Sequence, residues 1–380
     1  MRKTMIRLSK SVVGELEAEA VKSVIMDDGY LGMGKEVQRF EADVAAFLGV
    51  PPRNVVCVST GTAALHLATE ALLSSEDEVL VQSLTYVASF QAISAAGAIP
   101  VPCEVKPETL TIDLDDAERR LTERTRAIMP VHYASNPGNL DAVYAFARRH
   151  DLRVIEDAAH AFGCTYQGKR VGSAGDVCCF SFDGIKNITS GEGGAIVTQD
   201  ETVLGRVKDA RLLGVEKDTD KRFAGERSWD FDASRRGYRY HMSNIMAAIG
   251  RVQLRRFADE FAPKRVALAR RYRERLQCER GIRLLDTELG AVVPHIQPVC
   301  ILDGKRDAVR EALAEQDVQT GVHFKPNHML TLYGGGKPTL PRTEAIYREL
   351  LSLPLHPELE MADVDRVCDV VIAALHGGHS

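Results

Sequence analysis

The stretch DVCCFSFDGIKNITSGEGGAIVT, residues 176–198, decides how this part of the chain folds. Two apolar runs of strand length, CCFSF and AIVT, flank a segment rich in Gly, Ser and Thr that carries Lys186. The glycines of GEGG turn the chain from the first strand into the second. A lysine at the end of a core strand loses its proton easily and can attack a carbonyl to form a Schiff base. The alternative is a lysine in an exposed hairpin loop, and this stretch alone does not decide between the two.

Seven apolar runs of strand length alternate with helical patterns from about residue 54 to residue 200. The runs are NVVCVS, EVLVQ, IPVPCEV, RAIMPVHY, RVIEDAA, DVCCFSF and GGAIVT, and the helical patterns include AALHLATEALL and LDAVYAFARRH. This alternation predicts an α/β fold with a mostly parallel seven-stranded sheet that helices cover on both faces.

The C-terminal part predicts a smaller α/β domain. Two strand-like runs, at 291–302 and 318–324, accompany two helical patterns, at 307–316 and 362–375. We therefore expect a large domain over residues 1–250 and a small C-terminal domain over residues 251–380. The polar segment 215–240 reads as a long loop, and because long loops are often functional we expect it to reach toward a second subunit.

The composition is that of a globular protein. The chain has 380 residues, of which 45% are hydrophobic and 27% are charged. A net charge of −5 gives no reason to expect nucleic acid or an anionic membrane as a partner. We expect no membrane span and no secretory signal, because no apolar run is long enough. The eight cysteines lack C-x-x-C spacing, which indicates reduced thiols in a cytoplasmic protein.

Two further segments suggest what the lysine acts on. Asp157 follows the apolar run RVI, so it lies at the C-terminal end of a strand, where ligands bind in open α/β sheets. A carboxylate there can keep a heterocyclic nitrogen protonated, although Asp157 can also be the N-cap of a following helix. Thr60, Gly61 and Thr62 lie between a strand and a helix, where free N–H groups bind an anion, although Gly-Thr is also an ordinary N-cap.

A phosphate site, a carboxylate for a ring nitrogen and a lysine for an aldehyde are what pyridoxal 5′-phosphate requires of a protein. In this hypothesis Asp157 keeps the pyridinium protonated. Lys186 carries the Schiff base and then moves a proton between the substrate's α-carbon and C4′ of the cofactor. Ser181 can reach the phosphate from the strand before Lys186. Tyr86 can lie on the ring face, although a single tyrosine after a strand is more often a packing residue.

In order and spacing, seven segments resemble those of the sugar aminotransferases of the DegT/DnrJ/EryC1/StrS type. They are STGTAALHLA, SLTYVAS, PVHY, IEDAAHAFG, SFDGIKNITSGEGGAIVT, GYRYHMSNIMAAIGRVQL and LPLHPELEMADV. The resemblance covers nearly the whole chain. It implies the type I aspartate aminotransferase fold, with pyridoxal phosphate bound by the large domain at a homodimer interface. It also implies transfer of an amino group from L-glutamate to a keto-sugar, commonly a nucleotide-linked keto-deoxy-sugar, for amino-sugar or polysaccharide biosynthesis.

The same resemblance implies roles for single residues. Lys186 takes the Schiff-base role, Asp157 the pyridinium role and Tyr86 the ring-stacking role. His160 lies beside the ring. The residues that take the phosphate are Thr60, Gly61, Thr62 and Ser181.

Three positions depart from the family's pattern. Relatives often have His in place of Asp183, and many have Gln or Glu in place of His160. Where this chain has Arg239, relatives often have an Asn that reaches the phosphate of the neighbouring subunit's cofactor. Arg239 either binds that phosphate with a full charge or binds an acidic substrate. These changes leave the reaction class untouched and keep open an acidic, non-nucleotide keto-sugar such as an oxidised octulosonic acid.

We expect five further residues near the substrate: Tyr30, Asp183, His323, Lys325 and His328. The segment GVHFKPNHMLTLYGGG, which carries the last three, either borders the substrate pocket or is a surface turn. No acidic or cysteine partners accompany its histidines, so we predict no metal site.

A binding-only relative that holds the cofactor or a sugar for regulation is the alternative from another functional class. The lysine disfavours it, because a protein that only binds does not need a Schiff-base amine. The lysine also argues against the subgroup of the family that has His at this position and catalyses dehydration.

Overall fold

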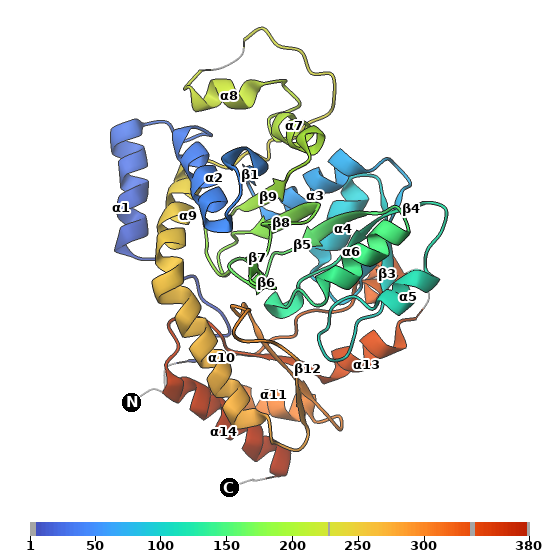
Figure 1. Cartoon of the computed structure of the whole chain (residues 1–380). Coiled ribbons are helices and arrows are strands. Elements are labelled where there is room, and N and C mark those ends of the chain that lie inside the picture. The colour runs from blue at the N-terminus through green and yellow to red at the C-terminus, as the bar shows by residue number, and fades with distance from the viewer. Residues whose placement is uncertain (1–4, 227–228, 335–338, 378–380) are drawn as a thin grey trace.

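A seven-stranded sheet forms the centre of the computed structural model, which describes residues 5–226, 229–334 and 339–377. Its strand order is β1-β9-β8-β5-β4-β2-β3 (Figure 1). The strands are β1 (Val55–Val58), β2 (Glu78–Gln82), β3 (Ile99–Cys103), β4 (Thr125–Met129), β5 (Arg153–Asp157), β8 (Val177–Ser181) and β9 (Gly194–Thr198). β9 is antiparallel to both of its neighbours, and the other neighbouring strands are parallel. The mostly parallel seven-stranded sheet predicted from the sequence is confirmed.

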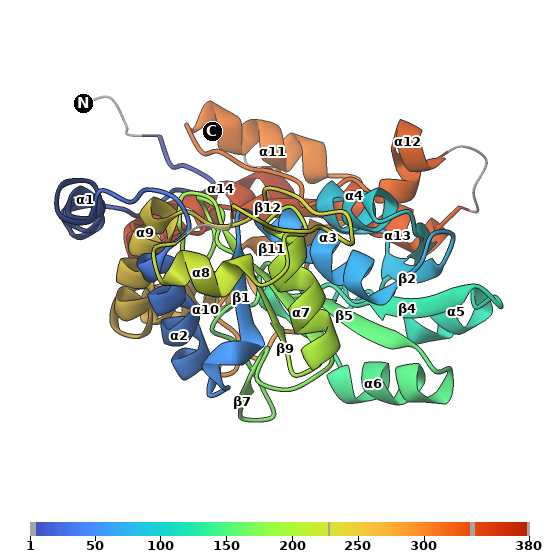
Figure 2. The same cartoon turned by 90° about the horizontal axis from the view of Figure 1, so that it is seen from above.

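Helices cover both faces of this sheet (Figure 2). Val79 of β2 packs on one face with residues of α3 (Gly61–Leu72), α4 (Val87–Ala95) and α7 (Glu201–Ala210). The next residue, Leu80, packs on the other face with residues of α5 (Leu114–Arg119) and α6 (Leu140–Arg149). Successive side chains of a strand point to opposite faces, so a sheet covered on both sides needs continuous apolar runs. The strands of this sheet have such continuous apolar runs in the sequence.

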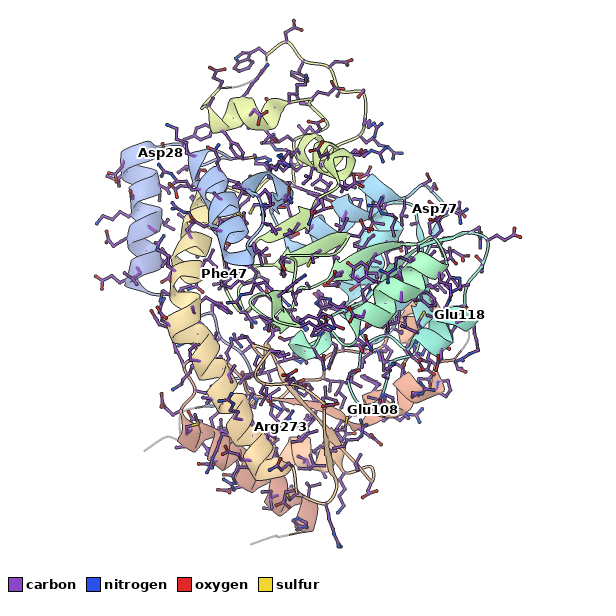
Figure 3. The ribbon with its side chains drawn as sticks, viewed as in Figure 1. Asp28, Phe47, Asp77, Glu108, Glu118 and Arg273 are labelled. Carbon is purple, nitrogen blue, oxygen red and sulfur yellow. The ribbon has the colours of Figure 1, made fainter. Side chains whose placement is uncertain are left out.

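Two helices extend the core beyond β1. α2 (Lys35–Leu48) and α9 (Asn244–Arg256) pack together beside β1 and β9. Phe47 of α2, labelled in Figure 3, stacks on Phe162 with ring centroids 5.1 Å apart. The hydroxyl of Ser243 accepts from Met246 N at 3.2 Å, so Ser243 is the N-cap of α9.

A second, three-stranded antiparallel sheet forms near the C-terminus, in the order β10-β11-β12. Its strands are β10 (Ile282–Leu284), β11 (Gln297–Ile301) and β12 (Leu350–Leu353), and it packs with α10 (Ala262–Leu276), α11 (Arg306–Glu315) and α14 (Met361–His376). Helix α9 continues through the π-helical turn η4 (Phe257–Phe261) into α10, across the predicted boundary at residue 250. The division into two domains stays a prediction.

The strand expected at 318–324 is wrong. Val318 makes only a single bridge to Ile6, and Gly321 makes one to Ser352 of β12. The third strand is instead β12, which directly follows helix α13 (Pro341–Glu349). Its four residues LLSL are too short and too uniformly apolar to be separated from the preceding helix by periodicity alone.

The remaining elements are short. They are α1 (Glu15–Ser23), η1 (Val24–Asp28), η2 (Pro52–Asn54), η3 (Tyr133–Ser135), β6 (Thr165–Tyr166), β7 (Lys169–Arg170), α8 (Asp218–Phe223), η5 (Asn327–Met329) and α12 (Thr331–Gly334). In the described part of the predicted loop 215–240, residues 215–226 and 229–240, there is one short helix, α8. Among the described residues, no helix is long and apolar enough to cross a membrane.

A buried ion pair joins α2, β1 and the end of α7. The Arg211 guanidinium, which has no exposed surface, donates to Glu41 Oε1 and to the carbonyl of Cys57, both at 2.6 Å. Glu41 Oε1 also accepts from Cys57 N at 2.8 Å. Because β1 is an edge strand, this pair fixes one border of the sheet.

Glu41→Ala should therefore lower the free energy of unfolding of the cofactor-free chain by about 3–5 kcal/mol, because it leaves a buried guanidinium unpaired. Urea denaturation followed by circular dichroism measures this loss. Glu19→Ala, which removes an exposed partner of Lys22 on α1, is the matched control and should cost about 0–1 kcal/mol. Equal losses in the two variants would contradict the role given to the buried pair.

Candidate active site

Two neighbouring parallel strands bring the central residues of the site together. Asp157 ends β5, where it lies opposite Cys179 of β8. Lys186 lies in the loop between β8 and β9 and is half-buried, not exposed as in a surface hairpin. Burial lowers the pKa of the Lys186 ammonium, while the carboxylates of Asp183 and Asp157 act in the opposite direction. Both carboxylates therefore lie within electrostatic reach of the amine.

The carboxylate of Asp157 is held by two donors. Asp157 is 5% exposed, and it accepts from Ser89 Oγ at 2.7 Å and from Ala159 N at 3.2 Å. No helix begins after β5 in residues 158–164, so the alternative of a helix N-cap is wrong. Ser89 was not predicted from the sequence.

The predicted phosphate turn lies against the ends of β8 and β9. Thr60 is the N-cap of α3, and its Oγ1 accepts from Ala63 N at 2.9 Å. A Cβ atom on Gly61 would lie 2.6 Å from Cβ of Ser181, and one on Gly194 would lie 2.4 Å from the carbonyl oxygen of Thr60. Only glycine permits these approaches. The structure therefore brings Ser181 and the start of α3 together, with Thr62 exposed in the first turn of the helix.

Three histidines lie within electrostatic reach of the lysine amine, and we call them the active-site histidines: His160, His295 and His323. Burial and the positive charge of Lys186 lower the pKa of all three rings, that of His323 to about 4. The rings of His160 and His295 have centroids 4.5 Å apart, and Nδ1 of each has no hydrogen-bond partner among the described residues. His295 was not predicted from the sequence. Its position directly before an apolar run of strand length is the signal that could have found it.

Tyr86 lies at the edge of this group. It is the N-cap residue of α4, it is 58% exposed, and its ring centroid is 5.4 Å from that of Phe324. Ser89, which binds Asp157, lies one helical turn further along α4. The beginning of α4 thus presents both an aromatic face and a donor to the site.

Three other predicted residues, Asp183, Lys325 and His328, differ in whether they can act at the site. Asp183 N lies 3.3 Å from Ser181 Oγ and Asp183 acts on the lysine charge, whereas Lys325 is exposed. Both ring nitrogens of His328 are engaged, by Ser83 Oγ at 2.7 Å and by Glu344 Oε1 at 3.2 Å. His328 therefore has no free ring nitrogen for a substrate.

Two predicted residues lie on other segments. Tyr30 is half-buried beside Gly34, and its carbonyl accepts from Asn244 Nδ2 at 2.7 Å. The side chain of Arg239 is exposed, and its backbone bridges to Leu212.

The residues present fit pyridoxal phosphate. A buried carboxylate can face a ring nitrogen, and a half-buried amine can meet an aldehyde. The start of α3 offers free N–H groups beside the Ser181 hydroxyl, a close-packed arrangement that suits a phosphate. The unpartnered Nδ1 of His160 offers one further polar contact. We propose these contacts as the cofactor site.

Comparison with known proteins agrees with this chemistry. The model of the DegT/DnrJ/EryC1/StrS aminotransferase family matches residues 12–372. A dTDP-4-dehydro-2,3,6-trideoxy-D-glucose 4-aminotransferase of Saccharopolyspora spinosa is 34% identical, over 96% of this chain and 95% of that protein. The spore coat polysaccharide biosynthesis protein SpsC of Bacillus subtilis is 33% identical, over 97% of each. The crystal structure of the aminotransferase TlmJ from Streptoalloteichus hindustanus has a TM-score of 0.91 at 33% identity, and covers 98% of this chain and 99% of that chain.

Gly61→Ala should weaken binding of pyridoxal phosphate to the cofactor-free chain by roughly tenfold or more, because the new methyl group displaces Ser181 from the phosphate contacts. An absorbance titration with pyridoxal phosphate measures the affinity. Gly205→Ala, on an exposed position of α7 with nothing within 4 Å of its Cβ, is the matched control. Unchanged affinity in Gly61→Ala would contradict the phosphate site.

The active-site histidines should make the cofactor-free chain less stable at low pH. Their pKa is lower in the folded chain, so the unfolded chain binds more protons as the pH falls below the usual histidine pKa of about 6.5. From pH 7 to pH 5.5 each should lower the free energy of unfolding by about 1 kcal/mol. Urea denaturation at both pH values tests this. His295→Asn should reduce the loss and the exposed control His376→Asn should not, and an unchanged loss in His295→Asn would count against the assignment.

Proposed function

The chain belongs to the DegT/DnrJ/EryC1/StrS aminotransferase family, whose members are pyridoxal-phosphate-dependent transaminases, and we propose that it transfers an amino group from L-glutamate to a keto-sugar. One observation carries this proposal: the half-buried amine of Lys186 lies within reach of the buried Asp157 carboxylate at the ends of two parallel strands. The names of two relatives, a dTDP-keto-sugar aminotransferase and a spore coat polysaccharide protein, support a nucleotide-linked keto-deoxy-sugar. They also support a role in amino-sugar or polysaccharide biosynthesis.

Pyridoxal phosphate, when bound, supplies an aldehyde carbon and a ring that withdraws electrons from the substrate's α-carbon. Burial lowers the pKa of Lys186, so its Nζ is more readily neutral and is available first as a nucleophile and then as the base that moves the α-proton. Asp157 keeps the ring nitrogen protonated, and the hydroxyl of Ser89 holds that carboxylate in one orientation. The backbone N–H groups at the start of α3 and the Ser181 hydroxyl hold the phosphate.

We further propose that the chain acts as a homodimer in the cytoplasm. The loop that carries Arg239 also carries the exposed aromatic residues Trp229 and Phe231, 86% and 58% exposed, which favours burial against a second subunit. In such a dimer Arg239 of one subunit would reach the phosphate in the other. The free thiols, all but Cys278 buried, support a reducing compartment.

An acidic, non-nucleotide keto-sugar is the second candidate substrate, and the exposed cation at Arg239 favours it. Arg239→Asn distinguishes the two uses of this residue. A phosphate contact predicts weaker binding of pyridoxal phosphate with every substrate, whereas a substrate contact predicts a higher KM for acidic sugars alone.

Lys186→Ala should abolish transamination, because it removes the amine that we propose as the nucleophile. Asp157→Asn should bind the cofactor but lower the rate by about 10²-fold or more, since an amide cannot hold the ring nitrogen protonated. Loss of the loaded enzyme's visible absorbance on addition of L-glutamate measures the first half-reaction. Lys169→Ala, at an exposed lysine on β7, is the control and should behave as wild type. A fully active Asp157→Asn would contradict the role of the carboxylate.

The acceptor is found by running the second half-reaction. The glutamate-treated enzyme is mixed with nucleotide-linked keto-deoxy-sugars and with free acidic keto-sugars, and recovery of the visible absorbance identifies the sugar that takes the amino group. We expect recovery with a nucleotide-linked sugar. Recovery with acidic sugars alone would establish the second candidate, and failure of L-glutamate to change the absorbance would overturn the donor.

A further inference from the structure

The turn η3, at Tyr133–Ser135, follows a strand of the large sheet and bonds to the backbones of the three active-site histidines. It follows β4, and His132 N donates to the carbonyl oxygen of Asp157 at 3.0 Å. The turn is therefore fixed to the strand that carries the pyridinium carboxylate. The side chains of Tyr133 and Ser135 have no exposed surface, although both carry a hydroxyl group.

The Ser135 hydroxyl joins two of the active-site histidines through their backbones. It donates to the carbonyl oxygen of His160 and accepts from His295 N, the latter at 2.9 Å. His160 follows β5 of the large sheet, and His295 precedes β11 of the small sheet. One hydroxyl thus holds together two segments from different sheets, whose rings lie in contact.

The Tyr133 hydroxyl holds the third histidine. It donates to the carbonyl oxygen of His323, whose Nδ1 lies 2.8 Å from Ser352 Oγ of β12. Burial raises the pKa of the Tyr133 phenol well above its ordinary value, so the hydroxyl keeps its proton and remains a donor. The ring packs in a cluster that contains Leu84, two residues beyond the end of β2, and Leu350 of β12.

The backbone of the turn is unusual for its residues. Ala134 has φ 51° and Ser135 has φ 74°, in the left-handed region that glycine adopts without steric cost. A non-glycine residue stays there only when surrounding contacts hold it, and such residues gather at functional sites. Here the contacts are the hydrogen bonds of the two neighbouring hydroxyls.

We propose that Tyr133 and Ser135 are positioning residues, which hold the three active-site histidines around the lysine amine. Because it concerns the same lysine, this role rests on the proposed function. Neither hydroxyl contacts the amine itself. The two act by fixing the backbone segments that carry the imidazoles, which keeps these rings within electrostatic reach of the amine.

Amide hydrogen exchange of the cofactor-free full chain tests the contacts without any substrate. Ser135→Ala keeps the β-carbon but removes the hydroxyl that receives the His295 N–H. Exchange in the peptide that contains His295 should become roughly fivefold faster or more, as expected for one lost hydrogen bond. Unchanged exchange there would overturn the contact.

Tyr133→Phe in the loaded enzyme tests positioning, with Tyr272→Phe as the matched control. The Tyr272 hydroxyl is also fully buried and donates to a carbonyl, that of Pro354 at 3.0 Å, within the core of the small sheet. Both variants should lower Tm. Only Tyr133→Phe should change the visible circular dichroism of bound pyridoxal phosphate and lower kcat for the glutamate half-reaction, by roughly fivefold or more. Equal spectra and rates in the two variants would mean that the turn has only a structural role and does not position the histidines.

Ser135→Gly distinguishes the effect of losing the hydroxyl from the effect of a change in backbone conformation. Glycine adopts the left-handed conformation freely, so this variant keeps the turn and removes only the hydrogen bonds. It should speed exchange in the peptide that contains His295 as Ser135→Ala does and should change the visible circular dichroism of bound pyridoxal phosphate, and a wild-type spectrum would overturn the role of the hydroxyl. If the exchange and spectra change as expected but L-glutamate leaves the absorbance unaltered, the proposed function fails and the positioning role stands.

Discussion

Asp157 ends β5 opposite Cys179 of β8, and the carbonyl of Cys179 accepts from Ala158 N at 2.9 Å. This parallel register brings the ends of two strands to the same edge of the sheet. One strand delivers a buried carboxylate there, and the other leads into the loop that carries Lys186. A shift of one residue would turn Asp157 to the opposite face of the sheet, because side chains alternate along a strand. The electrostatic link between the carboxylate and the amine depends on this register.

The rest of the site is built around that pair by close packing. Gly61 and Gly194 allow the start of α3 to approach the ends of β8 and β9, so that anion-binding N–H groups lie beside Ser181. His295 precedes β11 of the small sheet, and His323 bonds to Ser352 of β12. Burial together with the lysine charge favours the neutral form of both rings. The hydroxyls of η3 join these contributions. Burial keeps the amine partly from water, and this is what lowers its pKa.

Sequence reasoning was successful where the signal is local. Apolar runs predicted the seven strands, and the spacing of small residues after β1 predicted the turn at Thr60. The contacts that complete the site are not local: Ser89 is 68 residues from Asp157, and Ser135 is 160 residues from His295. No pattern in a single sequence pairs such residues, because only the strand order brings them together. The roles proposed for Arg239 and Tyr30 stay predictions, since they concern a second subunit or a substrate.

We propose that the amine of Lys186 bonds covalently to the cofactor. The most direct test treats the loaded protein with sodium borohydride, which reduces a carbon–nitrogen double bond to a stable single bond, and then maps the modified lysine by peptide mass spectrometry. We predict that one peptide, the one containing Lys186, carries the phosphopyridoxyl group. Modification of another lysine such as Lys325, or no modification of a chain that has bound the cofactor, would contradict the account.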